Sequence, residues 1–90
     1  MAQWFVYLLR CKDHSLYCGI TTDITRRLSE HNSGKGAKYI VPSPRPVKCV
    51  WKQEVGEKSD ALKLEYWIKQ RGTETKELIV KKKTKVALRP

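Results

Sequence analysis

The sequence contains no long hydrophobic run, and this absence limits where the chain can act. Its longest apolar run near the start has six residues, 4–9, far short of the ~20 that a membrane-spanning helix needs. The start also lacks the basic segment and the small-residue cleavage site of a signal peptide. We therefore expect a soluble protein of the cytoplasm that does not associate with membranes.

Cysteine is scarce as well, with three residues in 90. Cys11, Cys18 and Cys49 are odd in number, so they cannot form a complete disulfide framework. They also lack the close pairs that hold the metal in a zinc knuckle. Reduced and mostly buried thiols are the expected state, which agrees with a cytoplasmic protein.

Acidic residues are few, because nine Asp and Glu stand against 19 Lys and Arg and give a formal net charge of +10. A chain this basic favours a polyanionic partner, nucleic acid ahead of an anionic membrane surface. A merely soluble basic surface is the simpler alternative. With 90 residues the chain has room for one core, so this charge belongs to a single small domain.

The pattern of apolar residues predicts three strands. Residues 4–11 and 16–20 read as a β-hairpin with a short polar turn, and residues 47–55 read as a third strand. Three prolines exclude regular structure in the loop from 34 to 46. The order β-β-α-β-α-α indicates an α/β protein of the α+β type, with a small, mainly antiparallel three-stranded sheet flanked by helices. Residues 1–80 are expected to form this domain, and residues 81–90 a basic C-terminal tail.

Three helices are expected, each with a residue near its start that caps helix N-termini well. Gly34 and Gly72 follow the first and second helices, in the position where glycine commonly ends a helix. The expected helices and caps are a first helix behind Thr22 or Asp23 that runs to about Ser33, a second from Asp60 to Arg71 behind Ser59, and a third capped by Thr73 that runs to about Val80.

Helical periodicity shows which charged side chains share an apolar face. In the first helix Arg27 and His31 lie along the edge of the apolar stripe, whereas Arg26 points to solvent. In the second helix Glu65 is the carboxylate within the stripe. A buried carboxylate is costly unless it is compensated, so Glu65 either pairs with a buried Arg or holds a metal. Each residue alone has a simpler explanation, as a salt bridge, a solvated cation or an incidental histidine.

The spacing of these residues is more specific than any one of them. Tyr7 and Tyr17 lie ten residues apart on the predicted hairpin, and Arg27 follows ten residues later. The set resembles the GIY-YIG endonuclease superfamily, most of all its small single-domain bacterial branch. Val6-Tyr7-Leu8 takes the place of the first signature and Tyr17-Cys18-Gly19 that of the second. The pattern continues over residues 3–80 with Arg26-Arg27-Leu28, His31-Asn32 and the segment from Ala61 to Glu65.

The resemblance implies a metal-dependent endonuclease that hydrolyses phosphodiester bonds in DNA, in repair or processing. A lone domain of this size has little surface for reading a base sequence. Cleavage is therefore expected to be structure-directed or weakly sequence-specific. The catalytic residues that the resemblance implies are Tyr7, Tyr17, Arg27, His31 and Glu65.

Each of these residues would have its own role. Glu65 would hold one divalent cation, Mg²⁺ or Mn²⁺, with water and phosphate completing its ligands. Arg27 would bind the non-bridging oxygens as their charge grows. Tyr7 or Tyr17 would orient or deprotonate the attacking water, and His31 would assist. The sequence leaves open which tyrosine acts.

Further residues are expected to contact the nucleic acid. Gly19 would let a phosphate or another backbone approach the strand end, although a simple bulge explains it equally well. Lys35, Lys38 and Arg45 would follow the backbone of the nucleic acid, and Tyr39 would stack on a base or simply pack. The loop SGKGAKY lacks the spacing of a P-loop, so it does not predict triphosphate binding.

Two other functions fit the same charge. The first is a nucleic-acid-binding module of the same fold without catalysis. The second is an adaptor whose basic face binds an acidic protein. DNA is the expected partner, with RNA as the other option, and a protein partner or a homodimer stays open.

Overall fold

Three antiparallel strands form the centre of the fold. They are β1 (Trp4–Arg10), β2 (Leu16–Thr21) and β3 (Lys48–Gly56), arranged in the order β2-β1-β3. The computed structural model describes residues 3–33, 47–83 and 86. Each strand begins and ends within one residue of the range expected from the sequence.

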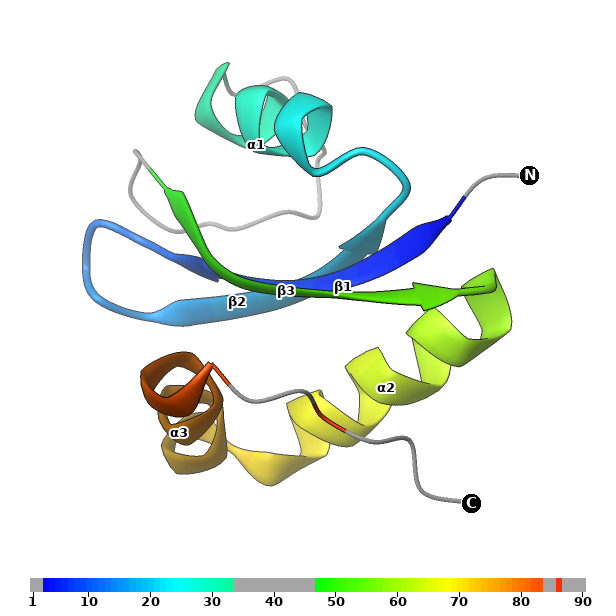
Figure 1. Ribbon diagram of the computed structural model, residues 1–90. Helices are drawn as coiled ribbons and strands as arrows, with labels where there is room; N and C mark the ends of the chain where they lie inside the picture. The colour runs from blue at the N-terminus through cyan, green and yellow to red at the C-terminus, as the bar shows by residue number, and fades with distance from the viewer. Residues whose placement is uncertain (1–2, 34–46, 84–85, 87–90) are drawn as a thin grey trace.

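Helices cover both faces of this sheet. α1 (Ile24–Ser33) lies over one face, while α2 (Lys58–Arg71) and α3 (Thr73–Lys82) lie over the opposite face (Figure 1). The order β-β-α-β-α-α and the α+β class are confirmed. No helix in the part of the chain that the structure describes is long and apolar enough to cross a bilayer.

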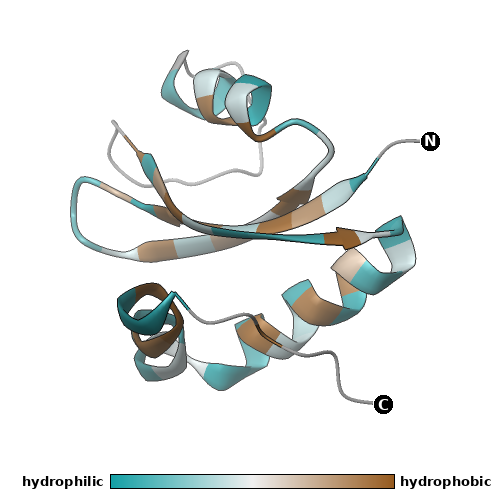
Figure 2. Cartoon of the chain, in the orientation of Figure 1, coloured by the Kyte–Doolittle hydropathy of each residue, from teal (hydrophilic) through white to brown (hydrophobic). Residues whose placement is uncertain are grey.

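Strand alternation divides the buried side chains into two clusters, because successive residues of a strand point to opposite faces. Figure 2 shows hydrophobic segments, in brown, on the strands and on the helices at both faces of the sheet. Val6 and Leu8 of β1 point toward α2 and α3. The cluster on that face is completed by Cys18, Trp51, Ala61, Leu64, Ile68 and Ile79. The smaller cluster on the face of α1 consists of Tyr7, Leu9, Cys11 and Val47, with Ile24 and Leu28 of α1 packed against it. All three cysteines are free thiols, and Cys11 and Cys18 are buried, as the sequence led us to expect.

Two of the predicted helix limits are present in the structure. Asp23 caps α1, since its Oδ1 accepts a hydrogen bond of 3.0 Å from the Arg26 backbone N–H. Gly72 ends α2 with φ at 84°, in the left-handed region that favours glycine. α3 continues to Lys82, beyond the end expected near Val80.

The caps expected for α2 and α3 are wrong. α2 begins at Lys58, before Ser59, and its N-cap Glu57 makes no side-chain capping hydrogen bond. Gly72, rather than Thr73, is the N-cap of α3, again without a side-chain bond. Both helices therefore begin through backbone bonds to the carbonyl groups of Glu57 and Gly72, so packing rather than a polar side chain sets where they start.

The pairing of β1 with β2 is regular along its length, whereas the pairing of β1 with β3 shifts twice. The shifts lie between Trp4 and Phe5 and between Leu8 and Leu9. Gly19 lies opposite Tyr7 in the regular pair, so the bulge offered as one explanation of this glycine is not what places it there.

An ion pair fastens the hairpin to α3. Arg10 donates from Nη1 and Nη2 to the two carboxylate oxygens of Glu77 at 2.6 and 2.7 Å, and also to the His14 carbonyl at 3.0 Å. This two-bond geometry is the strong form of an Arg–carboxylate pair. The Arg10 guanidinium accordingly lowers the pKa of Glu77. The loop between β1 and β2 is therefore held against the last helix.

The burial of α2 predicts which of its leucines stabilises the fold. Leu64 is 1% exposed in the larger cluster, whereas Leu62 on the same helix is 46% exposed. We expect Leu64→Ala to lower the free energy of unfolding by about 2–5 kcal/mol, because it leaves a cavity. The matched change Leu62→Ala is expected to cost no more than about 0.5 kcal/mol. Urea denaturation measures both, and equal losses would contradict the burial of this helix.

Candidate active site

Two tyrosines lie side by side on the sheet face that α1 covers. Tyr7 of β1 lies opposite Gly19 of β2, and Tyr17 lies two residues before that glycine on the same face. A β-carbon added at Gly19 would come within 2.5 Å of the Tyr7 hydroxyl oxygen and 3.1 Å of Tyr17 Cε2. The phenol rings therefore occupy the space that a side chain at residue 19 would need.

α1 places His31 against both of these rings. The Tyr7 hydroxyl lies 3.3 Å from His31 Nε2, and the ring centres of Tyr17 and His31 are 5.7 Å apart in an edge-to-face arrangement. His31 is 5% exposed, so its imidazole is enclosed in the protein. Its Nδ1 is buried and has no hydrogen-bond partner among the described residues.

Arg27 lies one helical turn before His31 and contacts the same tyrosine. It hydrogen-bonds to the Tyr7 hydroxyl, and its Nη1 donates to Glu30 Oε1 at 3.1 Å. Its side chain is 28% exposed, whereas that of Arg26 is 60% exposed. The two neighbouring arginines thus differ in direction as helical periodicity predicted.

Burial controls the protonation of the three groups. It raises the pKa of Tyr7 to about 12, although the hydrogen bond from Arg27 acts in the opposite direction. It also raises the pKa of Tyr17, and the charge of Lys69 opposes that rise. Burial and the nearby Arg27 charge lower the pKa of His31, so the imidazole is neutral at pH 7.

The tautomer of His31 sets the direction of the hydrogen bond between Tyr7 and His31. The Arg27 guanidinium only donates, so the Tyr7 oxygen accepts from it. When the neutral imidazole carries its proton on Nδ1, Tyr7 donates its own O–H to His31 Nε2, and Arg27, Tyr7 and His31 form a hydrogen-bond chain in which His31 is the acceptor at the end.

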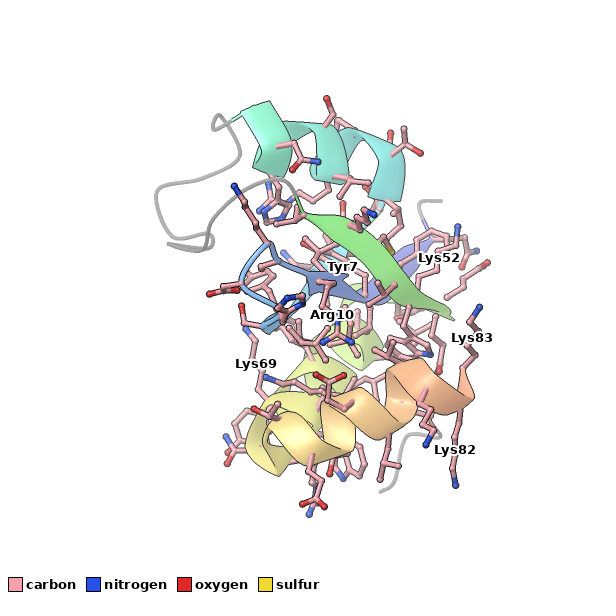
Figure 3. All side chains as sticks on the ribbon, turned by 90° about the vertical axis from the view of Figure 1, so that its left-hand side faces the viewer. Tyr7, Arg10, Lys52, Lys69, Lys82 and Lys83 are labelled. Carbon is pink, nitrogen blue, oxygen red and sulfur yellow. The ribbon has the colours of Figure 1, made fainter. Side chains whose placement is uncertain are left out.

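Glu65 of α2 approaches Tyr17 from the other side of the edge strand β2. Its side chain is 18% exposed, and its Oε2 lies 3.3 Å from Lys69 Nζ. The same ammonium lies 5.7 Å from the centre of the Tyr17 ring, and Glu65 is close enough to contribute to the raised pKa of that tyrosine. Figure 3 shows Tyr7 in the sheet and Lys69 on α2.

The cation beside Glu65 differs from the one expected. The sequence predicted either a buried Arg or a metal, and the cation that faces Glu65 is Lys69, with 46% of its side chain exposed. Lys69 was not among the residues expected at the site. The spacing of Glu and Lys four residues apart is the sequence signal that marks this pair.

A metal ion would find one carboxylate here. No group of three or more His, Cys, Asp or Glu side chains within residues 3–33, 47–83 and 86 is arranged to hold a metal. Mg²⁺ binds oxygen and keeps several waters, so a single carboxylate fits it when phosphate and water supply the remaining ligands. Glu65 suits that role once Lys69 releases its Oε2.

Besides the catalytic residues, five residues were expected to contact the nucleic acid. Lys35, Lys38, Tyr39 and Arg45 lie outside the described residues. The phosphate contact expected at Gly19 is wrong, because Gly19 is buried and the Tyr7 ring fills the space beside it.

A further cation on the same face was missed. Lys52 of β3 lies opposite Tyr7, so the two side chains point to one face of the sheet. With Ile24, Glu54 and Lys83 it lines a cavity of about 630 Å³ beside β3. Strand alternation was the signal, because the exposed Lys52 and Glu54 alternate with the buried Trp51 and the partly buried Gln53 and Val55.

Comparisons with known proteins agree with the motifs. A family model described as the GIY-YIG catalytic domain matches residues 3–84. A UPF0213 protein of Vibrio cholerae is 50% identical over 78 residues, which are 86% of this chain and 76% of that protein. The UPF0213 protein YsiG of Lactococcus lactis is 48% identical over 71 residues, 79% of this chain and 67% of that protein.

Solved structures show the same architecture. The solution structure of the UPF0213 protein BH0048 from Bacillus halodurans has 40% identity and a TM-score of 0.57, over 88% of this chain and 83% of that one. The solution structure of EF2693 from E. faecalis has 38% identity and a TM-score of 0.62, over 91% and 86% of the two chains.

The crowded position of Gly19 makes its substitution a test of how closely Tyr7 packs against it. We expect Gly19→Ala to lower the free energy of unfolding by about 1–3 kcal/mol, because the new methyl group overlaps the Tyr7 ring. Combining it with Tyr7→Leu should reduce that loss, since leucine lacks the overlapping ring atoms. Denaturation of the single and double variants measures this coupling. If Gly19→Ala costs as much in the Tyr7→Leu background as in the parent, Tyr7 is not what Gly19 accommodates.

Proposed function

Because the chain belongs to the GIY-YIG catalytic-domain family, as its motifs predicted, we propose that it is an endonuclease that hydrolyses phosphodiester bonds in DNA with the help of a divalent cation. The observation that carries the proposal is the convergence of Tyr7, Tyr17, Arg27 and His31 with Glu65. These residues come from β1, β2, α1 and α2 and are distant in the sequence. A role in DNA repair or processing and a cytoplasmic location are part of the proposal.

Arg27 would bind the scissile phosphate. Its planar guanidinium matches two phosphate oxygens and keeps its charge at any working pH. Its contacts with Tyr7 and Glu30 hold it beside the tyrosines before a substrate arrives. The formal charge of +10 would attract the DNA backbone to this face from a distance.

Tyr7 is better suited to relay a proton than to act as a tyrosinate. With a pKa of about 12, ionising Tyr7 at pH 7 costs about 7 kcal/mol. In a relay, the attacking water would give its proton to the Tyr7 oxygen while Tyr7 passes its own proton to His31 Nε2. The water oxygen forms the new bond to phosphorus, the bond to the leaving oxygen breaks, and that oxygen takes a proton from solvent. Tyr17 would pack against His31 and orient it.

Glu65 would hold one Mg²⁺ or Mn²⁺, with water and phosphate oxygens as the other ligands. When bound, such a cation supplies stabilisation for the negative charge on the phosphoryl and leaving oxygens. Lys52 and the four residues Lys35, Lys38, Tyr39 and Arg45 would contact the strands on either side. With so small a surface, we propose that DNA shape rather than base sequence directs cleavage.

One observation favours a second candidate, a nucleic-acid-binding module without catalysis. Glu65 is already paired with Lys69, which leaves its carboxylate partly neutralised. A binding module would show affinity that falls linearly with the logarithm of salt concentration, but no strand cleavage. The assay below separates the two.

A plasmid-nicking and flap-cleavage assay tests the nuclease directly. We expect cleavage with Mg²⁺ or Mn²⁺ and none with EDTA. Arg27→Ala and Glu65→Gln should each reduce the rate about 100-fold or more, because each removes stabilisation of transition-state charge. Arg26→Ala is the matched control on the same helix and should cleave nearly as the parent does. Cleavage that survives Glu65→Gln in a folded protein would exclude this assignment.

The protonation of His31 predicts the pH dependence of cleavage. The relay needs a neutral imidazole, and the pKa of His31 is held below its ordinary value of about 6.5 by burial. Cleavage should therefore be independent of pH near 7 and fall only below pH ~6.5, where His31 becomes protonated. His31→Gln should cleave more slowly and lose this acidic limb. A rate that climbs steadily toward pH 10 would instead favour a tyrosinate base.

A further inference from the structure

Lys69 lies between two groups of the proposed site. Its Nζ is 3.3 Å from Glu65 Oε2 and 5.7 Å from the centre of the Tyr17 ring. A Glu–Lys pair four residues apart is common on helices, where it is a weak surface interaction. This pair differs in position, because the carboxylate is 18% exposed and is the one through which the site would bind a cation.

The ammonium and a divalent cation compete for the same carboxylate. Both are positive, so a cation at Glu65 is disfavoured while Lys69 remains within ion-pair distance. Lys69 is free to move away, since 46% of its side chain is exposed and its stem is flexible. Glu65 is more enclosed and stays in place. The pair can therefore be opened from the side of Lys69.

A phosphate is the partner that would open it. The site gathers Arg27 and Lys69 around the tyrosines, and a DNA strand bound there brings phosphate oxygens within reach of a flexible ammonium. Transfer of Lys69 from carboxylate to phosphate keeps its charge paired and frees the oxygens of Glu65. Binding of DNA and binding of the cation would then favour each other.

We propose that Lys69 couples cation binding at Glu65 to DNA binding, by pairing with Glu65 in the free protein and with a substrate phosphate in the complex. The inference rests on the proposed function and adds the order in which DNA and the cation bind. Free protein holds Mg²⁺ or Mn²⁺ weakly, and the cation site forms when DNA is present. The cation-bound form is thereby confined to protein that has already bound DNA.

Electron paramagnetic resonance of Mn²⁺ tests the coupling without any measurement of activity. The full 90-residue chain is titrated with Mn²⁺ in the absence of DNA, and free Mn²⁺ is read from its signal. Lys69→Met should bind Mn²⁺ about tenfold more tightly than the parent, because the competing ammonium is gone. Lys69→Arg retains the positive charge and should resemble the parent.

Two further variants make the result specific. Lys63→Met removes the same charge from an exposed position of α2, so it controls for the loss of net charge. Glu65→Gln should abolish the Mn²⁺ site. If Lys63→Met tightens binding as much as Lys69→Met, or if Lys69→Met leaves it unchanged while Glu65→Gln removes it, the coupling is refuted and the nuclease proposal stands. If Glu65→Gln changes nothing, the cation assignment of the proposed function fails as well.

A nuclease-resistant phosphorothioate duplex completes the cycle. With this duplex present, and after correction for the Mn²⁺ that the duplex binds alone, the parent protein should bind Mn²⁺ about tenfold more tightly. Lys69→Met should show little further gain. An equal gain in both proteins would mean that DNA promotes cation binding without Lys69.

Discussion

The site depends on the close approach of the Tyr7 ring to the backbone of β2, which the missing side chain of Gly19 permits. A regular antiparallel pair places residue 19 opposite Tyr7, and the Tyr7 hydroxyl would lie 2.5 Å from a β-carbon there. With glycine there, the phenol lies over the neighbouring strand and its hydroxyl reaches His31 on α1. The hydrogen-bond chain from Arg27 through Tyr7 to His31 therefore depends on the absence of a side chain at residue 19.

Burial and charge affect the two parts of the proposed site differently. On the face of α1 the polar groups are buried, so burial shifts the pKa values of Tyr7 and His31 toward their neutral forms. At the edge formed by β2, Glu65 and Lys69 pair with each other and both retain contact with solvent. Under the proposed function, neutral Tyr7 and His31 would move a proton while Glu65 and Lys69 respond to the negative charge that accumulates on phosphate.

Much of the fold and part of the site follow from the sequence. Strand alternation and helical period found all six elements and the inward direction of Arg27 and His31, because both patterns are local. The caps predicted at Ser59 and Thr73 were wrong, because the start of a helix also depends on backbone geometry and packing, which the local sequence does not specify. The rest is long-range. The pairing of Tyr7 with Gly19 needs the register, the raised pKa of Tyr7 needs the core around it, and the position of Lys69 against Tyr17 needs α2 docked on β2.

The two clusters on either side of the sheet are unequal, and four of the five proposed catalytic residues lie on the side of the smaller one. α2 is anchored by Ala61, Leu64 and Ile68, all fully enclosed, whereas α1 rests on the partly covered Ile24 and Leu28. Local opening costs least where little apolar contact is lost, so the amide hydrogens of α1 should exchange with solvent sooner than those of α2. The phenol of Tyr7, which is 2% exposed, therefore lies beneath the helix that is expected to open more easily.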